Sequence, residues 1–208
     1  MKKIVIINCG GNLLSLSRAI EKFETNFLIT SDISKIKEAT HIFLPGVGAF
    51  KKAMNTLKEK ELKSLLQKLN YKKIKLLGIC LGMQILFENS EEDGYEEGLG
   101  LIDGEIKKIE LNEDDKKDRL KVPNIGWHKV VKNYKSPIFD GIDKNFYCYF
   151  VHSYHARLKN SHECLAEIKY GSNILSSIVK KDNIYGCQFH PEKSGEIGLK
   201  IIQNFLSL

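Results

Sequence analysis

The stretch Ile74-Lys75-Leu76-Leu77-Gly78-Ile79-Cys80-Leu81-Gly82 passes from an apolar run into a cysteine that is flanked by two glycines. Its apolar character predicts a buried strand over Lys72–Ile79, and a helix is predicted directly after it, over Leu81–Glu88. A strand that leads into a helix through one tight turn is the repeating step of α/β proteins with parallel sheets. The stretch therefore predicts an α/β fold in which Cys80 lies at the end of a strand.

The spacing of the glycines also indicates a nucleophile. Gly-x-Cys-x-Gly matches the turn that presents the nucleophile of α/β hydrolytic enzymes, with cysteine in place of serine. Side chains at Gly78 and Gly82 would collide with the neighbouring strand and helix. A helix N-terminus favours a thiolate at Cys80, and the backbone N–H of Leu81 is placed to donate to an oxyanion. The alternative is that Cys80 is only a small buried apolar residue.

A thiol nucleophile needs a base and a group that orients the base. Of the six histidines, His190 is best placed, because it directly follows the apolar strand Tyr185–Phe189. Pro191 stops that strand, and Glu192 comes two residues after the histidine, so one short turn can aim both side chains into the same cleft. The sequence predicts a catalytic triad of Cys80, His190 and Glu192, although His-Pro-Glu alone would be an ordinary turn.

Strand and helix signals alternate over the first half of the chain. Short apolar runs predict strands at Ile4–Ile7 and at His41–Leu44, the second of which is stopped by Pro45-Gly46. One helix is predicted to begin with its cap near Asn12, and another to cover Lys51–Leu69. Joined by right-handed βαβ connections, these elements predict a mostly parallel sheet.

The second half changes character. A charged loop is predicted at Asn112–Arg119, and the short strands after it indicate a mixed or antiparallel extension of the sheet. The predicted strands are Val130–Val131, Tyr147–Val151, Glu163–Ile168, Ile174–Ile178 and Gly186–Phe189, and Ile197–Leu206 closes the chain as a helix. Without a Pro/Ser-rich linker or an internal repeat, residues 1–208 are expected to form one domain.

Composition excludes several classes of protein. The formal net charge is +6, but lysines and acidic residues are mixed along the chain, which is typical of a solvated surface rather than of a nucleic-acid interface. The five cysteines form no C-x-x-C pair, which argues against a disulfide framework or a zinc ribbon and favours a reducing cytoplasm. No apolar run approaches the roughly 18 residues of a membrane span, and Asn8 ends the first one too early for a signal peptide.

The two catalytic motifs, Gly78–Gln84 and Gly186–Ser194, resemble the signatures of class I (triad-type) glutamine amidotransferases. Further segments are similar to one family in that class, the glutaminase subunits of imidazole glycerol phosphate synthase. These segments are Leu44–Phe50, Val122–Trp127, Tyr149–Tyr154 and Gly195–Lys200. The resemblance extends over nearly the whole chain, with the motifs in the right order.

The resemblance implies a three-layer, flavodoxin-like fold and the hydrolysis of L-glutamine to L-glutamate and ammonia. Cys80 would attack the glutamine side-chain amide, His190 would protonate the departing ammonia, and Glu192 would orient His190. The oxyanion donors would be Leu81 and either Val47 or Gly48, and the substrate would be held by Gly46, Gln84, Ser153 and Tyr154. No metal or cofactor is implied. The ammonia would pass to a (β/α)8 cyclase, bound as a heterodimer, that makes imidazole glycerol phosphate and AICAR in histidine biosynthesis.

Three departures from the family pattern concern the partner. The loop Asn8–Asn12 is one residue shorter than usual, Asn124 stands where histidine is usual, and His128 stands where asparagine is frequent; in the family the last two positions lie toward the partner. An alternative is therefore a paralogous subunit that supplies ammonia to a sugar amidotransferase in surface-glycan synthesis. A catalytically silent regulatory subunit or a cysteine protease of similar fold would be further alternatives; the complete triad disfavours the first, and the Met83-Gln84 and His190-Pro191-Glu192 pattern disfavours the second.

Overall fold

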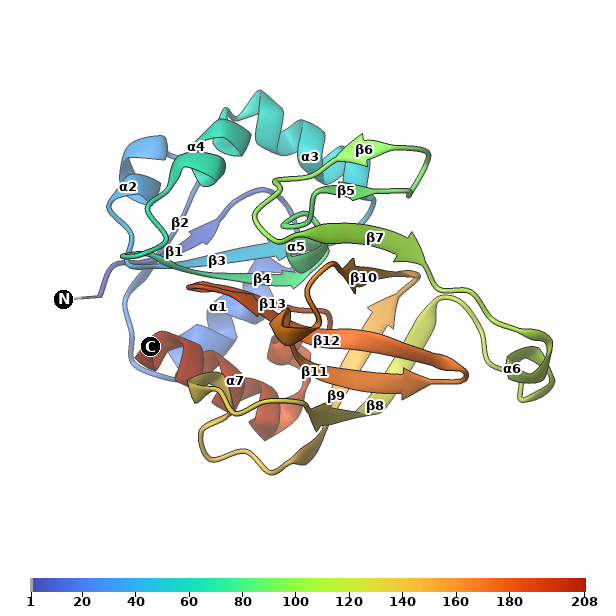
Figure 1. Cartoon of the computed structure of the whole chain (residues 1–208). Coiled ribbons are helices and arrows are strands. Elements are labelled where there is room, and N and C mark those ends of the chain that lie inside the picture. The colour runs from blue at the N-terminus through green and yellow to red at the C-terminus, as the bar shows by residue number, and fades with distance from the viewer. Residues whose placement is uncertain (1) are drawn as a thin grey trace.

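In the computed structural model, which describes residues 2–208, one long sheet runs through the molecule with helices on both faces (Figure 1). Its strands lie in the order β2 (Phe27–Thr30), β1 (Ile4–Ile7), β3 (His41–Gly46), β4 (Lys75–Cys80), β13 (Ile184–Cys187), β12 (Asn173–Lys181), β11 (Cys164–Tyr170), β8 (Asn124–Lys132) and β9 (Asn145–His152). The strands from β2 to β13 are parallel, whereas β12, β11, β8 and β9 pair antiparallel with their neighbours. The predicted parallel sheet with an antiparallel extension is confirmed.

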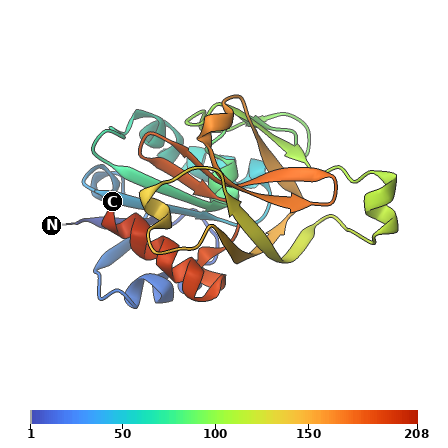
Figure 2. The same ribbon diagram turned by 60° about the horizontal axis from the view of Figure 1, so that its bottom comes forward.

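Two hydrophobic cores lie on opposite faces of the sheet. Because side chains alternate along a strand, Ile4 and Ile6 of β1 belong to one core, whereas Val5 and Ile7 belong to the other. The first core is covered by α1 (Leu13–Glu21) and α7 (Gly195–Ser207), and the second by α2 (Ile33–Lys37), α3 (Phe50–Glu59) and α4 (Leu62–Lys68). Figure 2 shows α1 and α7 side by side on their face. These helices and the sheet form the three layers of an α/β fold.

A second, smaller sheet adjoins the antiparallel half. Its strands lie in the order β10 (Tyr154–Leu158), β7 (Gly104–Lys108), β5 (Asn89–Ser90) and β6 (Glu96–Glu97). The remaining elements are α5 (Leu81–Gln84), α6 (Glu113–Lys117) and the 3-10 turns η1 (Pro137–Phe139), η2 (Ser161–Glu163) and η3 (Pro191–Lys193). Only Ser153 separates β9 of the large sheet from β10 of the small one, so this point of the chain joins the two sheets.

Several predicted elements differ in extent from the observed ones, and three of these differences concern breaks, loops and strand ends. The helix expected over Lys51–Leu69 is divided into α3 and α4, because Glu61 adopts a left-handed conformation with a φ of 57°. The loop expected at Asn112–Arg119 contains α6, whose first turn is closed by reciprocal hydrogen bonds between Asn112 and Asp115. The third difference is that β3 continues through Pro45 to Gly46.

The continuation of β3 matters because it brings the Pro-Gly segment next to Cys80. Pro45 lies opposite Ile79 and Gly46 opposite Cys80 in the pairing with β4. The pairing with β1 on the other side has already ended at Phe43. At Pro45 the strand is therefore paired on one side only. The missing proline N–H breaks no hydrogen bond to a second strand, so β3 can continue past it.

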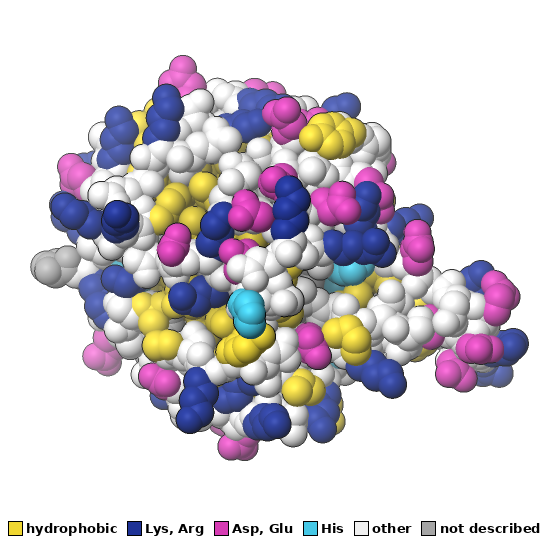
Figure 3. Space-filling view, viewed as in Figure 1, with side chains coloured by type: hydrophobic (Ala, Val, Ile, Leu, Met, Phe, Trp, Pro, Cys, Tyr) yellow, Lys and Arg dark blue, Asp and Glu magenta, His cyan; other side chains and the backbone are white. Residues whose placement is uncertain are grey.

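Acidic and basic side chains are interspersed on the face drawn in Figure 3, which agrees with the mixed pattern in the sequence. Within residues 2–208, no helix is both long enough and apolar enough to cross a membrane.

Candidate active site

Cys80 occupies a strained turn at the junction of β4 and α5. Its φ of 54° and ψ of −113° lie outside the regions that L-residues normally adopt. The turn is possible because α5 approaches the sheet very closely: a Cβ at Gly82 would lie 1.7 Å from the Leu44 carbonyl oxygen, and one at Gly78 would lie 2.6 Å from the Gly82 carbonyl oxygen. These distances agree with the steric argument made from the glycine spacing: side chains at Gly78 and Gly82 would collide with the neighbouring backbone.

The helix after Cys80 is shorter than predicted. α5 covers only Leu81–Gln84, a single turn, whereas the sequence predicted a helix to Glu88. A single turn carries a small dipole, so it supplies little of the positive potential that a longer helix would bring to Cys80. Polar groups from other segments must therefore contribute more to the environment of the sulfur.

His190 and Glu192 are brought together by the turn after β13. η3 begins at Pro191, and it returns the carboxylate so that Glu192 Oε1 lies 2.9 Å from His190 Nδ1. Both side chains are 3% exposed. The His190 backbone is held on both sides, because its N–H donates to the Tyr149 carbonyl and its carbonyl accepts from the Ser194 hydroxyl. The imidazole is therefore fixed before any substrate arrives.

The pKa of His190 is raised to about 9. Burial by itself would lower this pKa, but the interactions of the ring with Cys80 and Glu192 favour the imidazolium and outweigh burial. At neutral pH His190 therefore carries a proton, as a general acid must.

The other four cysteines differ from Cys80 in their setting. Burial raises the pKa of Cys9 to about 11 and that of Cys148 to about 12, and it raises the pKa values of Cys164 and Cys187 as well. These thiols remain protonated at neutral pH and are poor nucleophiles.

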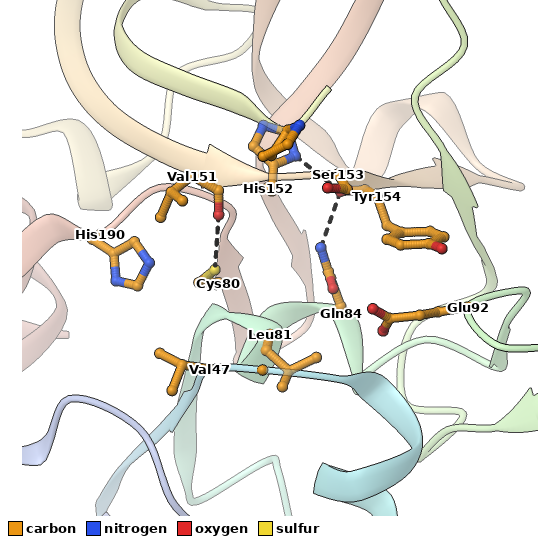
Figure 4. A pocket seen from close by; sticks show the side chains of 12 residues that line it. Val47, Cys80, Leu81, Gln84, Glu92, Val151, His152, Ser153, Tyr154 and His190 are labelled. Carbon is orange, nitrogen blue, oxygen red and sulfur yellow. Dashed lines mark hydrogen bonds between the residues drawn. The ribbon is translucent and has the colours of Figure 1, made fainter. Parts of the chain in front are cut away.

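A pocket of about 280 Å³ opens at Cys80 (Figure 4). Most of the residues predicted to bind or activate a substrate line it: Val47, Gly48, Cys80, Leu81, Gln84, Ser153, Tyr154 and His190. Glu192 lies behind His190, and Gly46 does not line the pocket. A Cβ at Gly46 would lie 2.8 Å from the Gly82 nitrogen, so this glycine lets β3 approach α5. The structure thus places Gly46 beside the pocket rather than in its wall.

The sulfur of Cys80 has two further polar neighbours. It lies 3.9 Å from the Val151 carbonyl oxygen and 3.8 Å from Nε2 of Gln188. Figure 4 shows Cys80 between His190 and Gln84, with the Val151 carbonyl directed at the sulfur. The carbonyl accepts from the thiol, whereas the amide donates to the sulfur.

The segment Val47-Gly48 forms an open edge of the pocket. Val47 is 53% exposed, Gly48 has a φ of 95°, and a Cβ at Gly48 would have no atom within 4 Å. Leu81 supplies the first N–H of α5 on the other side of Cys80. Backbone donors therefore border the pocket from two segments.

Four lining residues were missed from the sequence: Glu92, Pro123, Val151 and His152. Glu92 is the most informative, because its Oε2 accepts a 2.7 Å hydrogen bond from the N–H of Phe50, the first residue of α3. Burial raises the pKa of Glu92 above its usual value. In the sequence it stands in the acidic run Glu91-Glu92-Asp93, which is typical of a solvated loop and gives no signal of a pocket.

Comparisons with known proteins agree with this geometry. Residues 5–208 match the family model "Glutamine amidotransferase class-I". The imidazole glycerol phosphate synthase subunit HisH of Geobacillus sp. (strain WCH70) is 43% identical over 206 residues, which are 99% of this chain and 96% of that protein. HisH of Lactococcus lactis subsp. lactis (strain IL1403) is 44% identical over 207 residues, which are 99% of this chain and 98% of that protein.

Solved structures show the same fold at lower identity. A glutamine amidotransferase superposes with a TM-score of 0.75 at 14% identity, covering 98% of this chain and 97% of the other. PurLQS from Thermotoga maritima superposes with a TM-score of 0.69 at 16% identity, covering 100% of this chain and 99% of the other. The chain belongs to the class-I glutamine amidotransferases and, within them, to the family of HisH subunits of imidazole glycerol phosphate synthase.

Proposed function

We propose that residues 1–208 act as one glutaminase domain that hydrolyses L-glutamine to L-glutamate and ammonia in the cytoplasm. The observation that carries the proposal is the buried His190–Glu192 pair, whose imidazole lines the same pocket as a cysteine held in a strained turn. This arrangement supplies a nucleophile, a proton donor and an orienting carboxylate, the three groups that acyl transfer to a thiol needs.

The reaction follows from the positions of these groups. The Cys80 sulfur attacks the carbonyl carbon of the glutamine side-chain amide, and the oxyanion is held by the N–H of Leu81 and that of Val47 or Gly48. His190 gives its proton to the amide nitrogen, the C–N bond breaks, and ammonia leaves a thioester on Cys80. His190 then takes a proton from water, which attacks the thioester and releases glutamate.

The walls of the pocket suit an amino acid. The carboxylate of Glu92 supplies a negative charge for the α-ammonium group, and Ser153 and Tyr154 supply polar contacts at the junction of the two sheets. Gln84 donates its Nε2–H₂ to the Tyr154 carbonyl and to Oε1 of Gln188, both at 3.0 Å. Gln84 therefore offers the substrate its carbonyl oxygen, while its amide nitrogen holds the wall in place.

We assign the ammonia acceptor to a (β/α)8 cyclase, bound as a heterodimer, which uses the ammonia in making imidazole glycerol phosphate and AICAR for histidine biosynthesis. The full-length relatives support this assignment. A surface for such a partner is present beside the pocket: Ile125, Trp127 and Tyr147 are each more than half exposed, and they lie on the same face of β8 and β9 as the pocket residue Val151.

Two of the three departures from the family pattern lie on β8, behind this surface. Asn124 is fully buried and His128 is half-buried, on the face of β8 opposite to Ile125 and Trp127. They were expected to lie toward the partner, but the alternation of side chains along the strand turns them inward. These two departures therefore do not alter the side chains of Ile125 and Trp127, and the full-length relatives favour the histidine-pathway cyclase over the sugar amidotransferase.

The assignment is tested by glutamate release from the chain alone, with a histidine-pathway cyclase and its acceptor substrate, and with a sugar amidotransferase and its nucleotide-sugar. We expect low release from the isolated chain and a stimulation of about 10²-fold or more with the cyclase, on the scale of one oxyanion donor moved into place. Stimulation by the sugar amidotransferase alone would contradict the assignment of the partner but not the hydrolysis.

The pH dependence of hydrolysis should depend on Glu192. In the unmodified chain we expect kcat/KM to fall as pH rises through about 9, where His190 loses its proton. Glu192→Gln removes one of the two interactions that raise this pKa and leaves the burial that lowers it, so the alkaline fall should move to lower pH. The measurement is kcat/KM for glutamine from pH 6 to 10.5. An unchanged alkaline fall in a folded Glu192→Gln chain would show that His190 does not set it.

A further inference from the structure

Gln188 has no part in the mechanism above, although it touches the reacting sulfur. It lies two residues before His190, its side chain is fully buried, and its backbone N–H donates to the Ser177 carbonyl at 2.9 Å. The side-chain amide lies between Gln84 on one side and Cys80 on the other. A buried amide at this place either donates to the sulfur or accepts from it, and the two cases have opposite effects on a thiolate.

The direction of the amide follows from a backbone carbonyl. The Tyr154 carbonyl oxygen can only accept, so the Gln84 atom that faces it at 3.0 Å is the donor Nε2. The same NH₂ group faces Gln188 at 3.0 Å, and the Gln188 atom that meets it must therefore be the acceptor Oε1. Nε2 of Gln188 is then left on the side of the Cys80 sulfur, at 3.8 Å.

A second chain of contacts acts on the same carbonyl. His152 donates from Nδ1 to the Tyr154 oxygen at 2.9 Å, and its Nε2 accepts from Nδ2 of Asn124 at 3.0 Å. Burial lowers the pKa of His152 to about 4, so the ring is neutral and has one N–H to give. Because Nδ1 carries that proton, Nε2 can only accept, so Asn124 must face it with Nδ2; its Oδ1 is then left buried with no partner in the part of the chain that the structure describes.

We propose that Gln188 holds the Cys80 thiolate by donating its Nε2–H to the sulfur, and that Gln84, the Tyr154 carbonyl and the His152–Asn124 pair fix the direction of this donor. The inference rests on the proposed use of Cys80 as the nucleophile. A donor to an ionised sulfur is a charge-assisted hydrogen bond, which favours the thiolate over the thiol. It compensates for the single-turn helix α5 and opposes the Val151 carbonyl, which favours the thiol.

The test measures the thiolate directly. Alkylation of Cys80 by iodoacetamide is followed from pH 5 to 10 by mass spectrometry of the peptide that contains it. Gln188→Met keeps the volume and removes the donor, so the midpoint of the alkylation profile should rise by about one pH unit, which is ~tenfold less thiolate below the midpoint. Gln188→Glu keeps the contact with Gln84 but places a carboxylate at the sulfur, and the midpoint should rise further.

The residues that carry the other titratable groups around the sulfur are the same in these variants as in the unmodified chain. They are His190 and Glu192 after β13, Cys187 on β13, His152 on β9 and Glu92 in the loop after β5. Ser177→Ala is the matched control, because Ser177 is fully buried beside Gln188 and its hydroxyl has no partner among residues 2–208. This control should keep the alkylation profile and the glutaminase kcat of the unmodified chain, whereas Gln188→Met should lower kcat about tenfold with little change in KM.

The proposal is overturned if a folded Gln188→Met or Gln188→Glu chain keeps the unmodified profile. The unmodified chain provides a measurement that needs no variant: the ¹⁵N and ¹H signals of the Gln188 side-chain amide should titrate together with Cys80, and signals that stay constant would also overturn it. Alkylation does not require hydrolysis. A chain that shows the expected shifts but releases no glutamate would therefore contradict the proposed function and leave the Gln188 donor supported.

Discussion

Cys80→Ala should abolish glutamine-dependent turnover and leave ammonia-dependent turnover of the complex with the cyclase intact. The substitution removes the sulfur that attacks the amide carbonyl, and the other four cysteines have pKa values raised by burial. None of them lines the pocket, so none can take over the attack. Ammonia supplied as an ammonium salt bypasses this chain, because the ring closure belongs to the partner.

The measurement compares product formation by the complex with glutamine and with an ammonium salt. Cys187→Ala is the matched control, because Cys187 is a buried thiol on the neighbouring strand whose sulfur lies 3.7 Å from the Gly78 carbonyl, outside the pocket. It should retain glutamine-dependent turnover. Glutamate release by Cys80→Ala would show that Cys80 is not the nucleophile. Loss of both the glutamine-dependent and the ammonia-dependent activity would mean that this chain holds part of the acceptor site.

The contact between His190 and Glu192 was predictable because its geometry is local. His190 and Glu192 are two residues apart, and a proline at the end of a strand forces the turn that joins them. The turn at Cys80 was predictable for a similar reason, since glycines on both sides of a cysteine indicate a close approach of backbone segments. In both cases the information lies within a few consecutive residues.

The contacts between distant segments could not be predicted. Gln84 and Gln188 are 104 positions apart, and no periodicity or motif pairs them. Glu92 enters the pocket only because β5 and β6, each of two residues, fold their loop back against α3. Strands of that length leave no alternating pattern in the sequence.

The early end of α5 has a tertiary cause. The apolar residues after Gln84 continue a helical pattern, but the Ile85 carbonyl accepts from the N–H of Leu99 and the Leu86 carbonyl accepts from that of Leu101. Backbone groups that a longer helix would use are thus satisfied by a segment more than ten residues away. Local propensity was overruled by this packing. The break between α3 and α4 at Glu61 was also not predictable, because no glycine or proline marks it.

His190→Asn should lower kcat for glutamine hydrolysis by about 10³–10⁴-fold, because it removes the protonated ring that lies beside the sulfur. Asparagine is chosen because its Nδ2 can occupy the place of the imidazole Nδ1 and donate to Glu192. Leaving that carboxylate buried without a donor would destabilise the fold and confuse the result. The ammonium-dependent reaction of the complex should again persist, since the second chemistry does not use this histidine.

The control for this substitution is His155→Asn. His155 is buried on β10 outside the pocket, and burial lowers its pKa, so it is a neutral ring with no route to the sulfur. Single-turnover experiments should show that His190→Asn fails to form the thioester, whereas His155→Asn forms it at the rate of the unmodified chain. Thermal unfolding separates this effect from a loss of fold. A folded His190→Asn chain with full activity, together with an inactive His155→Asn chain, would show that His190 is not the residue that transfers the proton. It would thereby contradict the proposed triad.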